Sequence, residues 1–245
     1  MMLRNIEMDI SCFKKLDENK FLQIDLSKES VGRSMRNLFY NKDADYIFLN
    51  YGNKKDLNKA LEVVKPQKLI IDFYMWDCTL KRYEDISKYI NDLNRAKSLG
   101  VDKCVQIDFS VWYNDPQPIQ LANLYKNFIR LHIAQQLGFL TVLNFNTILP
   151  YWYDIYEYVL PKRVNTVFMD NGHGEFRKDK NHTQNEIKAL HNLLSLTEVK
   201  TFIIQSSKVS DDDMKPFAYE LKKAGIEYAI IPSQTKVLGL FYKRR

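Results

Sequence analysis

Short apolar runs recur along the chain and alternate with longer amphipathic stretches, and this alternation constrains the fold more than any other feature. The runs are rich in Val, Ile, Leu and Phe and are apolar throughout, as is typical of strands buried on both faces of a parallel sheet. We expect strands over residues 21–26, 46–50, 68–73, 103–109, 139–145, 166–170, 201–205 and 228–232. Crossover helices are expected over residues 55–64, 80–99, 116–137, 151–160, 183–196 and 211–224.

Glycines lie at the ends of several expected helices. Gly100, Gly138 and Gly225 each stand between an expected helix and the next strand, where a left-handed residue ends a helix. Eight strands in 245 residues predict an α/β parallel-sheet protein, with a (β/α)8 TIM-barrel-like fold as the first interpretation. An open doubly wound sheet is the alternative. Because no linker composition appears, we expect a single α/β domain over residues 1–245, with an irregular N-terminal segment over about 1–44.

Four of the apolar runs carry an aspartate at or next to their carboxyl end, namely Asp25, Asp72, Asp108 and Asp170. The carboxyl ends of parallel strands meet at one rim, so these carboxylates should converge there. The same rim should receive Asn50, Asn144, Asn146, Asn171, His173, Gln205 and Ser206. Such a rim suits a hard cation or a general acid and base that work as a pair. The alternative is that each aspartate only caps a helix or binds a loop amide.

The densest group of possible ligands follows the sixth expected strand, over residues 170–175. We assign Asp72, Asp108, Asp170 and His173 as candidate catalytic residues, with Asp108 and Asp170 as candidate ligands of Mg²⁺ or Mn²⁺. A polar turn at Gly172 or Gly174 would explain the same loop without a metal. No glycine-rich nucleotide fingerprint is present in the sequence, so no nucleotide cofactor is predicted.

The expected helix over 116–137 carries a polar stripe at 3,4,3 spacing, next to an apolar stripe with the same spacing. The stripe consists of Gln120, Asn123, Asn127 and Arg130, and it could read a ligand or a partner. We add Ser110 and Asn144 as further candidate binding residues, because Ser110 follows one expected strand and Asn144 lies at the carboxyl end of another. The alternative is a row of ordinary surface amides.

Charge and aromatic content bear on partners. The net charge of +6 fits nucleic acid as a partner, and it equally fits a lysine-rich solvated surface. Tyrosines are dense over residues 151–158, where they could stack on bases or pack as core plus contact surface. The second interpretation is the one we favour.

Three cysteines without a C-x-x-C spacing suggest neither a disulfide framework nor a zinc site, which favours a reducing compartment. No signal peptide and no apolar window of membrane-spanning length is found, so we expect no membrane association. A cytoplasmic protein is predicted.

A resemblance to a known family is carried by the run Ile107-Asp108-Phe109-Ser110, followed by Pro116, Gln120, Asn123, Tyr125, Asn127, Arg130, Gln135 or Gln136, Gly138 and Val142. That family, found in bacteriophages and mobile elements, is designated domain of unknown function 4417. The resemblance covers about residues 45–206 and departs from the family pattern at Lys126 and Phe128, where arginines are usual. It implies a phage or mobile-element origin, and hence a bacterial host cytoplasm, but no particular chemistry.

Two functional hypotheses follow. In the first, the acidic rim binds a divalent cation and the protein is an enzyme that acts on a phosphate-containing substrate, either a nucleotide or nucleic acid. In the second, the protein has no catalytic activity, and the helix stripe, the tyrosines and the basic C-terminus bind nucleic acid or other phage proteins.

Overall fold

The computed structural model describes residues 10–28, 30–32, 44–51, 54–73, 80–111, 114–171, 180–206 and 211–232. Its strands are β1 (Ser30–Gly32), β2 (Tyr46–Asn50), β3 (Leu69–Asp72), β4 (Lys103–Val105), β5 (Leu140–Asn144), β6 (Arg163–Asn171), β7 (Glu198–Ser206) and β8 (Glu227–Pro232). Its α-helices are α2 (Lys54–Leu61), α4 (Ile86–Ser98), α5 (Gln117–Gln136), α6 (Tyr153–Val159), α8 (Lys180–Leu196) and α9 (Asp211–Lys223). The expected alternation of strands and helices is confirmed.

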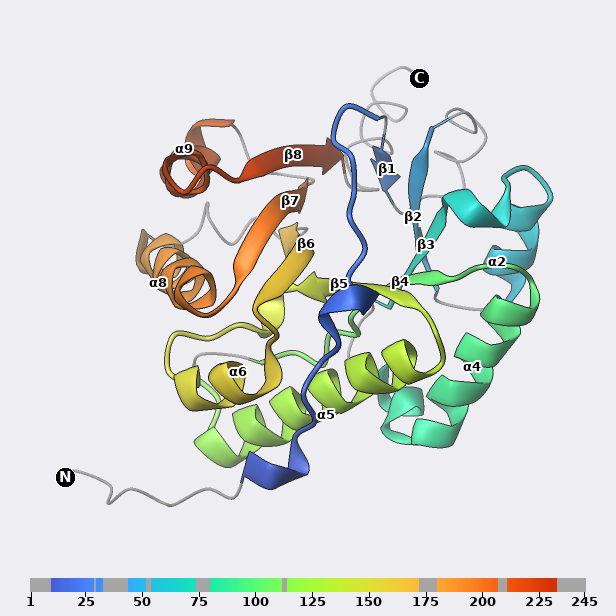
Figure 1. The fold of residues 1–245 in the computed structure, drawn as a ribbon, viewed down its shortest axis with the longest axis horizontal. Coiled ribbons are helices and arrows are strands. Elements are labelled where there is room, and N and C mark those ends of the chain that lie inside the picture. The colour runs from blue at the N-terminus through green and yellow to red at the C-terminus, as the bar shows by residue number, and fades with distance from the viewer. Residues whose placement is uncertain are drawn as a thin grey trace, which may run out of the picture.

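The eight strands form one sheet in the order of the sequence, and every neighbouring pair is parallel. A doubly wound sheet reverses its strand order at a switch point, and no such reversal occurs between β1 and β8. Right-handed crossovers in an unreversed order place the helices on one face, so the sheet curls with its helices outside (Figure 1). The fold is therefore an α/β fold with a curled parallel sheet. No pairing of β8 with β1 closes the curl within the described ranges.

The concave face of the sheet is lined by one apolar residue from each of seven strands. These residues are Phe48, Ile70, Val105, Val142, Phe168, Ile203 and Ile231, and we call them the inner layer. Phe48 and Phe168 stack with ring centroids 5.1 Å apart, although they stand on non-adjacent strands. The curl is thus filled by side chains at this level, as in the interior of a small barrel.

The N-terminal segment differs from the expectation. The run over 21–26 was expected to be the first strand, but it forms only a single bridge, Phe21 to Thr141 of β5, and β1 begins at Ser30. Leu22 and Ile24 instead pack on the inner layer, and the segment runs along the concave face (Figure 1). An apolar run can pack inside a curled sheet instead of adding a strand to its edge, because both positions remove its apolar side chains from water.

Threonine hydroxyls hold this segment in place. Its backbone N–H at Ile24 donates to Thr166 Oγ1 at 3.1 Å, and Thr201 Oγ1 donates to the carbonyl of Ile24 at 3.3 Å. At Phe21, the carbonyl accepts from Asn165 Nδ2 at 2.8 Å. Polar side chains of the sheet therefore supply the hydrogen bonds that a strand ladder would otherwise give to the segment's backbone.

The helices pack on the convex face through two larger apolar clusters, one mainly over β2–β4 and the other mainly over β5–β7. The three glycines after α4, α5 and α9 confirm the expected helix stops, since Gly100, Gly138 and Gly225 have φ of 86°, 82° and 72°. Among the described helices, none combines the length and apolar composition that crossing a lipid bilayer requires.

Candidate functional site

Polar side chains form a second layer on the concave face, directly toward the carboxyl ends of the strands. Side chains alternate faces along a strand, so a residue two positions after an inner-layer residue points to the same side. Asp72 follows Ile70 by two, Asn144 follows Val142, Asp170 follows Phe168 and Gln205 follows Ile203. All four are buried. We call Asp72, Asn144, Asp170 and Gln205 the rim layer.

Within this layer, Asp170 and Gln205 are direct neighbours. They are Cα partners on the parallel strands β6 and β7, and their exposed fractions are 3% and 0%. Cα partners on adjacent strands lie about 5 Å apart, and these two side chains point to the same face. A carboxylate and a carboxamide thus lie next to each other, and both are buried from solvent.

The loop after β5 fixes the backbone at Asp170. Asn146 accepts from the Asp170 N–H at 3.1 Å through Oδ1 and donates from Nδ2 to the Asp170 carbonyl at 2.9 Å. The side chain of Asn144 caps the short 3-10 helix Phe145–Thr147, because its Oδ1 accepts from the Asn146 N–H at 3.0 Å. Asn144 therefore shapes the loop that positions Asp170.

Gln106 is a further buried amide at this end of the sheet. Its Oε1 accepts from the backbone N–H of Asn144 at 3.1 Å, which ties the end of β4 to the end of β5. Gln106 was not among the candidate site residues predicted from the sequence. Its position inside the apolar run over 103–109 is the only signal that could have indicated a buried polar role.

Asp108 lies three residues beyond β4 and is also buried. The segment around it is held by α5. Asn127 Oδ1 accepts from the Phe109 N–H at 2.8 Å and Nδ2 donates to the Phe109 carbonyl at 2.9 Å, while Asn123 Nδ2 donates to the Ser110 carbonyl at 2.8 Å. The chain that carries Asp108 and Ser110 is therefore fixed to the helix by three hydrogen bonds.

The rest of the polar stripe on α5 also faces the chain itself. Arg130 donates from Nε to the Tyr83 carbonyl at 2.9 Å, and its guanidinium lies 4.8 Å from the centre of the Phe109 ring. Burial lowers the pKa of Arg130. Gln120 accepts from Trp152 Nε1 at 2.9 Å. The stripe thus joins α5 to its neighbours, and ligand contacts by Gln120, Asn123, Asn127 and Arg130 stay a prediction.

Asp25 does not belong to the buried rim. It is exposed, it does not end a strand, and its carboxylate accepts from Ser27 N at 3.0 Å and Ser27 Oγ at 2.6 Å. These hydrogen bonds lower the pKa of Asp25. The expectation that Asp25 converges with the other aspartates is wrong, because its run is not a strand of the sheet.

His173 and the loop 172–179 lie outside the described residues. Within the described ranges, no three His, Cys, Asp or Glu side chains come close enough together to hold a metal ion. Asp72, Asp108 and Asp170 are each buried near strand ends, but they do not form such a group with other described residues.

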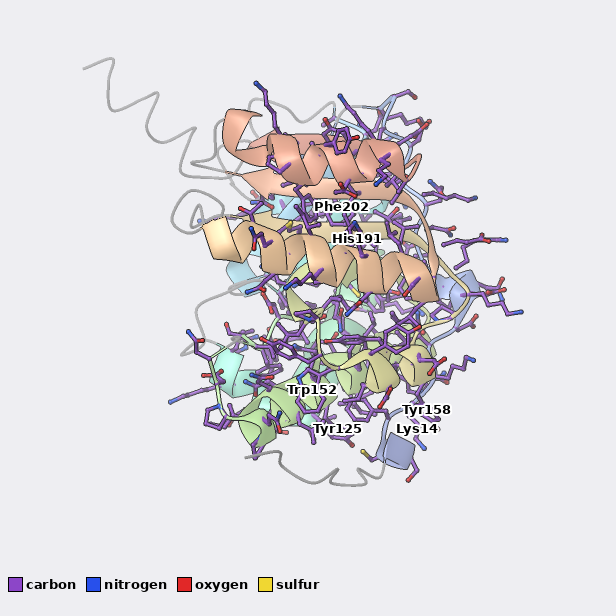
Figure 2. The ribbon with its side chains drawn as sticks, turned by 90° about the vertical axis from the view of Figure 1, so that its left-hand side faces the viewer. Lys14, Tyr125, Trp152, Tyr158, His191 and Phe202 are labelled. Atoms are coloured by element: carbon purple, nitrogen blue, oxygen red, sulfur yellow. The ribbon has the colours of Figure 1, made fainter. Side chains whose placement is uncertain are left out.

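The tyrosines over 151–158 divide between core and surface, as we favoured. Tyr156 is buried and accepts from the Leu149 N–H at 2.8 Å, whereas Tyr151, Tyr153 and Tyr158 are exposed. Figure 2 shows Tyr158 and Lys14 on the flank that also carries Tyr125 and Trp152. The segment with Lys14 reaches α6 through the bond from Leu16 N to the Val159 carbonyl at 2.9 Å.

Comparison with known proteins gives no match to any family model and no match to a curated protein sequence. The class that the fold defines is an α/β protein with a curled parallel sheet. The resemblance to the phage and mobile-element family stays a prediction.

Proposed function

We propose that this protein is a metal-dependent enzyme that acts on a phosphate-containing substrate, a nucleotide or nucleic acid, at the carboxyl rim of its sheet. One observation carries the proposal: Asp72 and Asp170 are both buried on the concave face, one step above the inner layer, on strands that run in the same direction. In α/β proteins of this kind, ligands bind at that end of the strands.

The donor set fits Mg²⁺ or Mn²⁺. Both cations prefer oxygen ligands, and the rim layer offers carboxylate and amide oxygens. A magnesium site commonly uses one or two carboxylates and takes its other ligands from water and substrate phosphates, so it does not require three clustered acidic side chains. We assign Asp108 and Asp170 as the metal ligands, and Asp72 as a catalytic carboxylate that does not bind the metal.

When bound, such a cation would polarise a phosphoryl oxygen and lower the pKa of a coordinated water. The chain's own residues then have separate roles in the proposal. The Asn146 amide holds the backbone of Asp170 in position. The two hydrogen bonds of Asn127 to the Phe109 backbone hold the segment that follows Asp108. His173 would transfer a proton to or from the substrate.

The proposal includes a closed (β/α)8 barrel. β1 and β8, the first and last strands of the sheet, come next to each other (Figure 1), which supports closure of the curl between them. A location in the bacterial cytoplasm is also proposed. It is supported by the buried thiol of Cys104, which forms no disulfide.

The test compares thermal unfolding with and without Mg²⁺ or Mn²⁺, in the presence of pyrophosphate, for the wild type and for Asp170→Asn. A ligand that binds only the folded state raises the melting temperature, and about 100-fold excess over Kd stabilises by about 2.7 kcal/mol. We expect a cation-dependent rise in the wild type that Asp170→Asn loses. Asp102→Asn is the matched control, because Asp102 precedes β4 at the opposite end of the sheet. Equal responses of all three proteins would disprove the proposal.

A second candidate function, binding without catalysis, is supported by the exposed tyrosines of α5 and α6. Asp154 and Glu157 lie on the same exposed side of α6 as Tyr153 and Tyr158. Acidic side chains repel a polyanion, so this surface fits a partner protein, such as another phage protein, better than nucleic acid. A nucleic acid partner would instead bind with an affinity that falls steeply with salt and does not depend on Asp170.

A further inference from the structure

Gln205 is the one rim-layer residue whose side-chain amide makes no hydrogen bond to the chain. Its exposed fraction is 0%, and neither Oε1 nor Nε2 has a hydrogen-bond partner in the described structure. Leaving a buried polar group unpaired costs about 1–3 kcal/mol, and Gln205 leaves two such groups unpaired. An unpaired buried polar group in a natural chain calls for an explanation, and one such explanation is a bound ligand that pairs with it.

The position of this amide indicates what could satisfy it. Gln205 lies on the concave face beside Asp170, and Ile203 of the inner layer is two residues before it. The inner layer closes the site from below with apolar side chains, so a partner has to approach from the carboxyl ends of the strands. That is the side on which the proposed substrate would bind.

The two amide groups require different things from a partner. Oε1 accepts a hydrogen bond and Nε2 donates one, and they stand side by side in a plane. A metal ion could satisfy only Oε1, and a phosphate oxygen could satisfy only Nε2. A planar edge with a neighbouring donor and acceptor satisfies both, and a carboxamide makes such paired bonds with the edge of a nucleobase.

We propose that Gln205 recognises the base of a nucleotide substrate by pairing with a donor–acceptor edge of that base. This inference rests on the proposed function and deepens it, because it makes the substrate a nucleotide instead of any phosphate compound. Asp170 then lies next to the base-recognition residue in the same layer. Gln205 is a binding residue and takes no part in the reaction.

The experiment measures affinity by calorimetry, with Mg²⁺ present, for three kinds of probe: adenosine and cytidine, which lack phosphate; ribose 5-phosphate, which lacks a base; and AMP and CMP, which have both. We expect the wild type to bind AMP or CMP at least about 10-fold more tightly than ribose 5-phosphate, the effect of one buried paired contact. Gln205→Met should remove this difference and leave ribose 5-phosphate binding within about 2-fold. Gln67→Met, an exposed amide before β3, is the matched control.

The different probes and variants distinguish base recognition by Gln205 from the proposed enzyme activity. Equal binding of ribose 5-phosphate and the nucleotides by the wild type overturns base recognition, while loss of both in Asp170→Asn would still support the enzyme. Binding of the nucleosides that depends on Gln205, without any response to phosphate or Mg²⁺, supports base recognition and overturns the enzyme. If no probe binds, both are overturned.

A structural role for Gln205 makes a different prediction. If the amide only holds an internal water, Gln205→Met should lower the melting temperature without ligand. If the amide waits for a ligand, the same variant should melt at the same temperature or higher, because it removes two unpaired polar groups from the interior. A lower melting temperature would overturn the inference.

Discussion

The side-chain amide of Asn127 binds both backbone polar groups of Phe109, accepting from its N–H at 2.8 Å and donating to its carbonyl at 2.9 Å. Asn127 is buried on α5, and Phe109 follows β4 by four residues. This pairing replaces the hydrogen bonds that a longer strand would give, and it holds the segment next to Asp108.

Replacing Asn127 with Leu should therefore destabilise the protein strongly. The variant leaves a buried N–H and a buried carbonyl at Phe109 without partners, at a cost of about 2–5 kcal/mol in the free energy of unfolding. Urea denaturation followed by circular dichroism measures it. Asn123→Leu is the control, because Asn123 is half-buried and water can replace both its bond to the Ser110 carbonyl and the bond it accepts from Lys126 Nζ at 3.4 Å. We therefore expect a loss below about 1 kcal/mol. Equal losses of stability in the two variants would show that the hydrogen bonds between Asn127 and the Phe109 backbone are not specially important.

Two buried tyrosines in contact with each other should respond in opposite ways to loss of their hydroxyls. Tyr83 donates to Asp92 Oδ2 at 3.0 Å, whereas the Tyr89 hydroxyl has no hydrogen-bond partner in the described part of the chain. Tyr83→Phe should lose about 1–3 kcal/mol of stability, as expected for a bond to a charged group. Tyr89→Phe should leave stability unchanged or raise it, since it removes an unpaired buried group. Thermal melting of both variants decides; a larger loss for Tyr89→Phe would contradict the assignment.

Buried tyrosines also make stability depend on alkaline pH. Burial, with the nearby Asp92 carboxylate, raises the pKa of Tyr51 to about 12, whereas a tyrosine in the unfolded chain ionises near 10. Below about pH 10 both states hold the proton, and the contribution of Tyr51 to stability is complete. Between these values the unfolded state loses its proton first, so stability should fall as the pH rises from about 10 to 12.

Denaturant unfolding at a series of alkaline pH values checks this dependence. Tyr51→Phe should make the fall shallower, because the variant cannot release that proton on unfolding. The control is Tyr219→Phe, since Tyr219 is exposed and contributes no burial. A slope identical in wild type and Tyr51→Phe would show that other groups cause the loss.

The fold was predictable from the sequence to the extent that local signals decide it. Apolar runs at regular spacing indicated the parallel strands, and Gly100, Gly138 and Gly225 marked the helix ends because each backbone needs a positive φ there. Asp72, Asp108 and Asp170 are buried near strand ends, which agrees with their positions in the strands expected from the sequence. These features depend on neighbours in the chain.

The features that sequence reasoning missed depend on what a side chain meets after folding. The 3,4,3 spacing of the α5 stripe showed that its residues share a face, but spacing cannot tell whether that face meets solvent, a ligand or the backbone at Phe109. In the same way, the apolar residues of the run over 21–26 indicate burial, but its position inside the curl depends on contacts made only after folding, such as those with the hydroxyls of Thr166 and Thr201.

The position of the N-terminal segment makes the last prediction. Ile24 packs on the inner layer, while its neighbour Gln23 is exposed. Ile24→Ala leaves a cavity among residues from several strands, and such truncations cost about 2–5 kcal/mol. Gln23→Ala should cost below about 1 kcal/mol, because Gln23 loses only half-exposed hydrogen bonds, one of them to Thr201 at 3.1 Å. Urea unfolding of the two variants measures both. If the segment lay on the surface, the two substitutions would have similar small effects. A large difference between these adjacent positions is therefore the result that supports a segment packed within the curl.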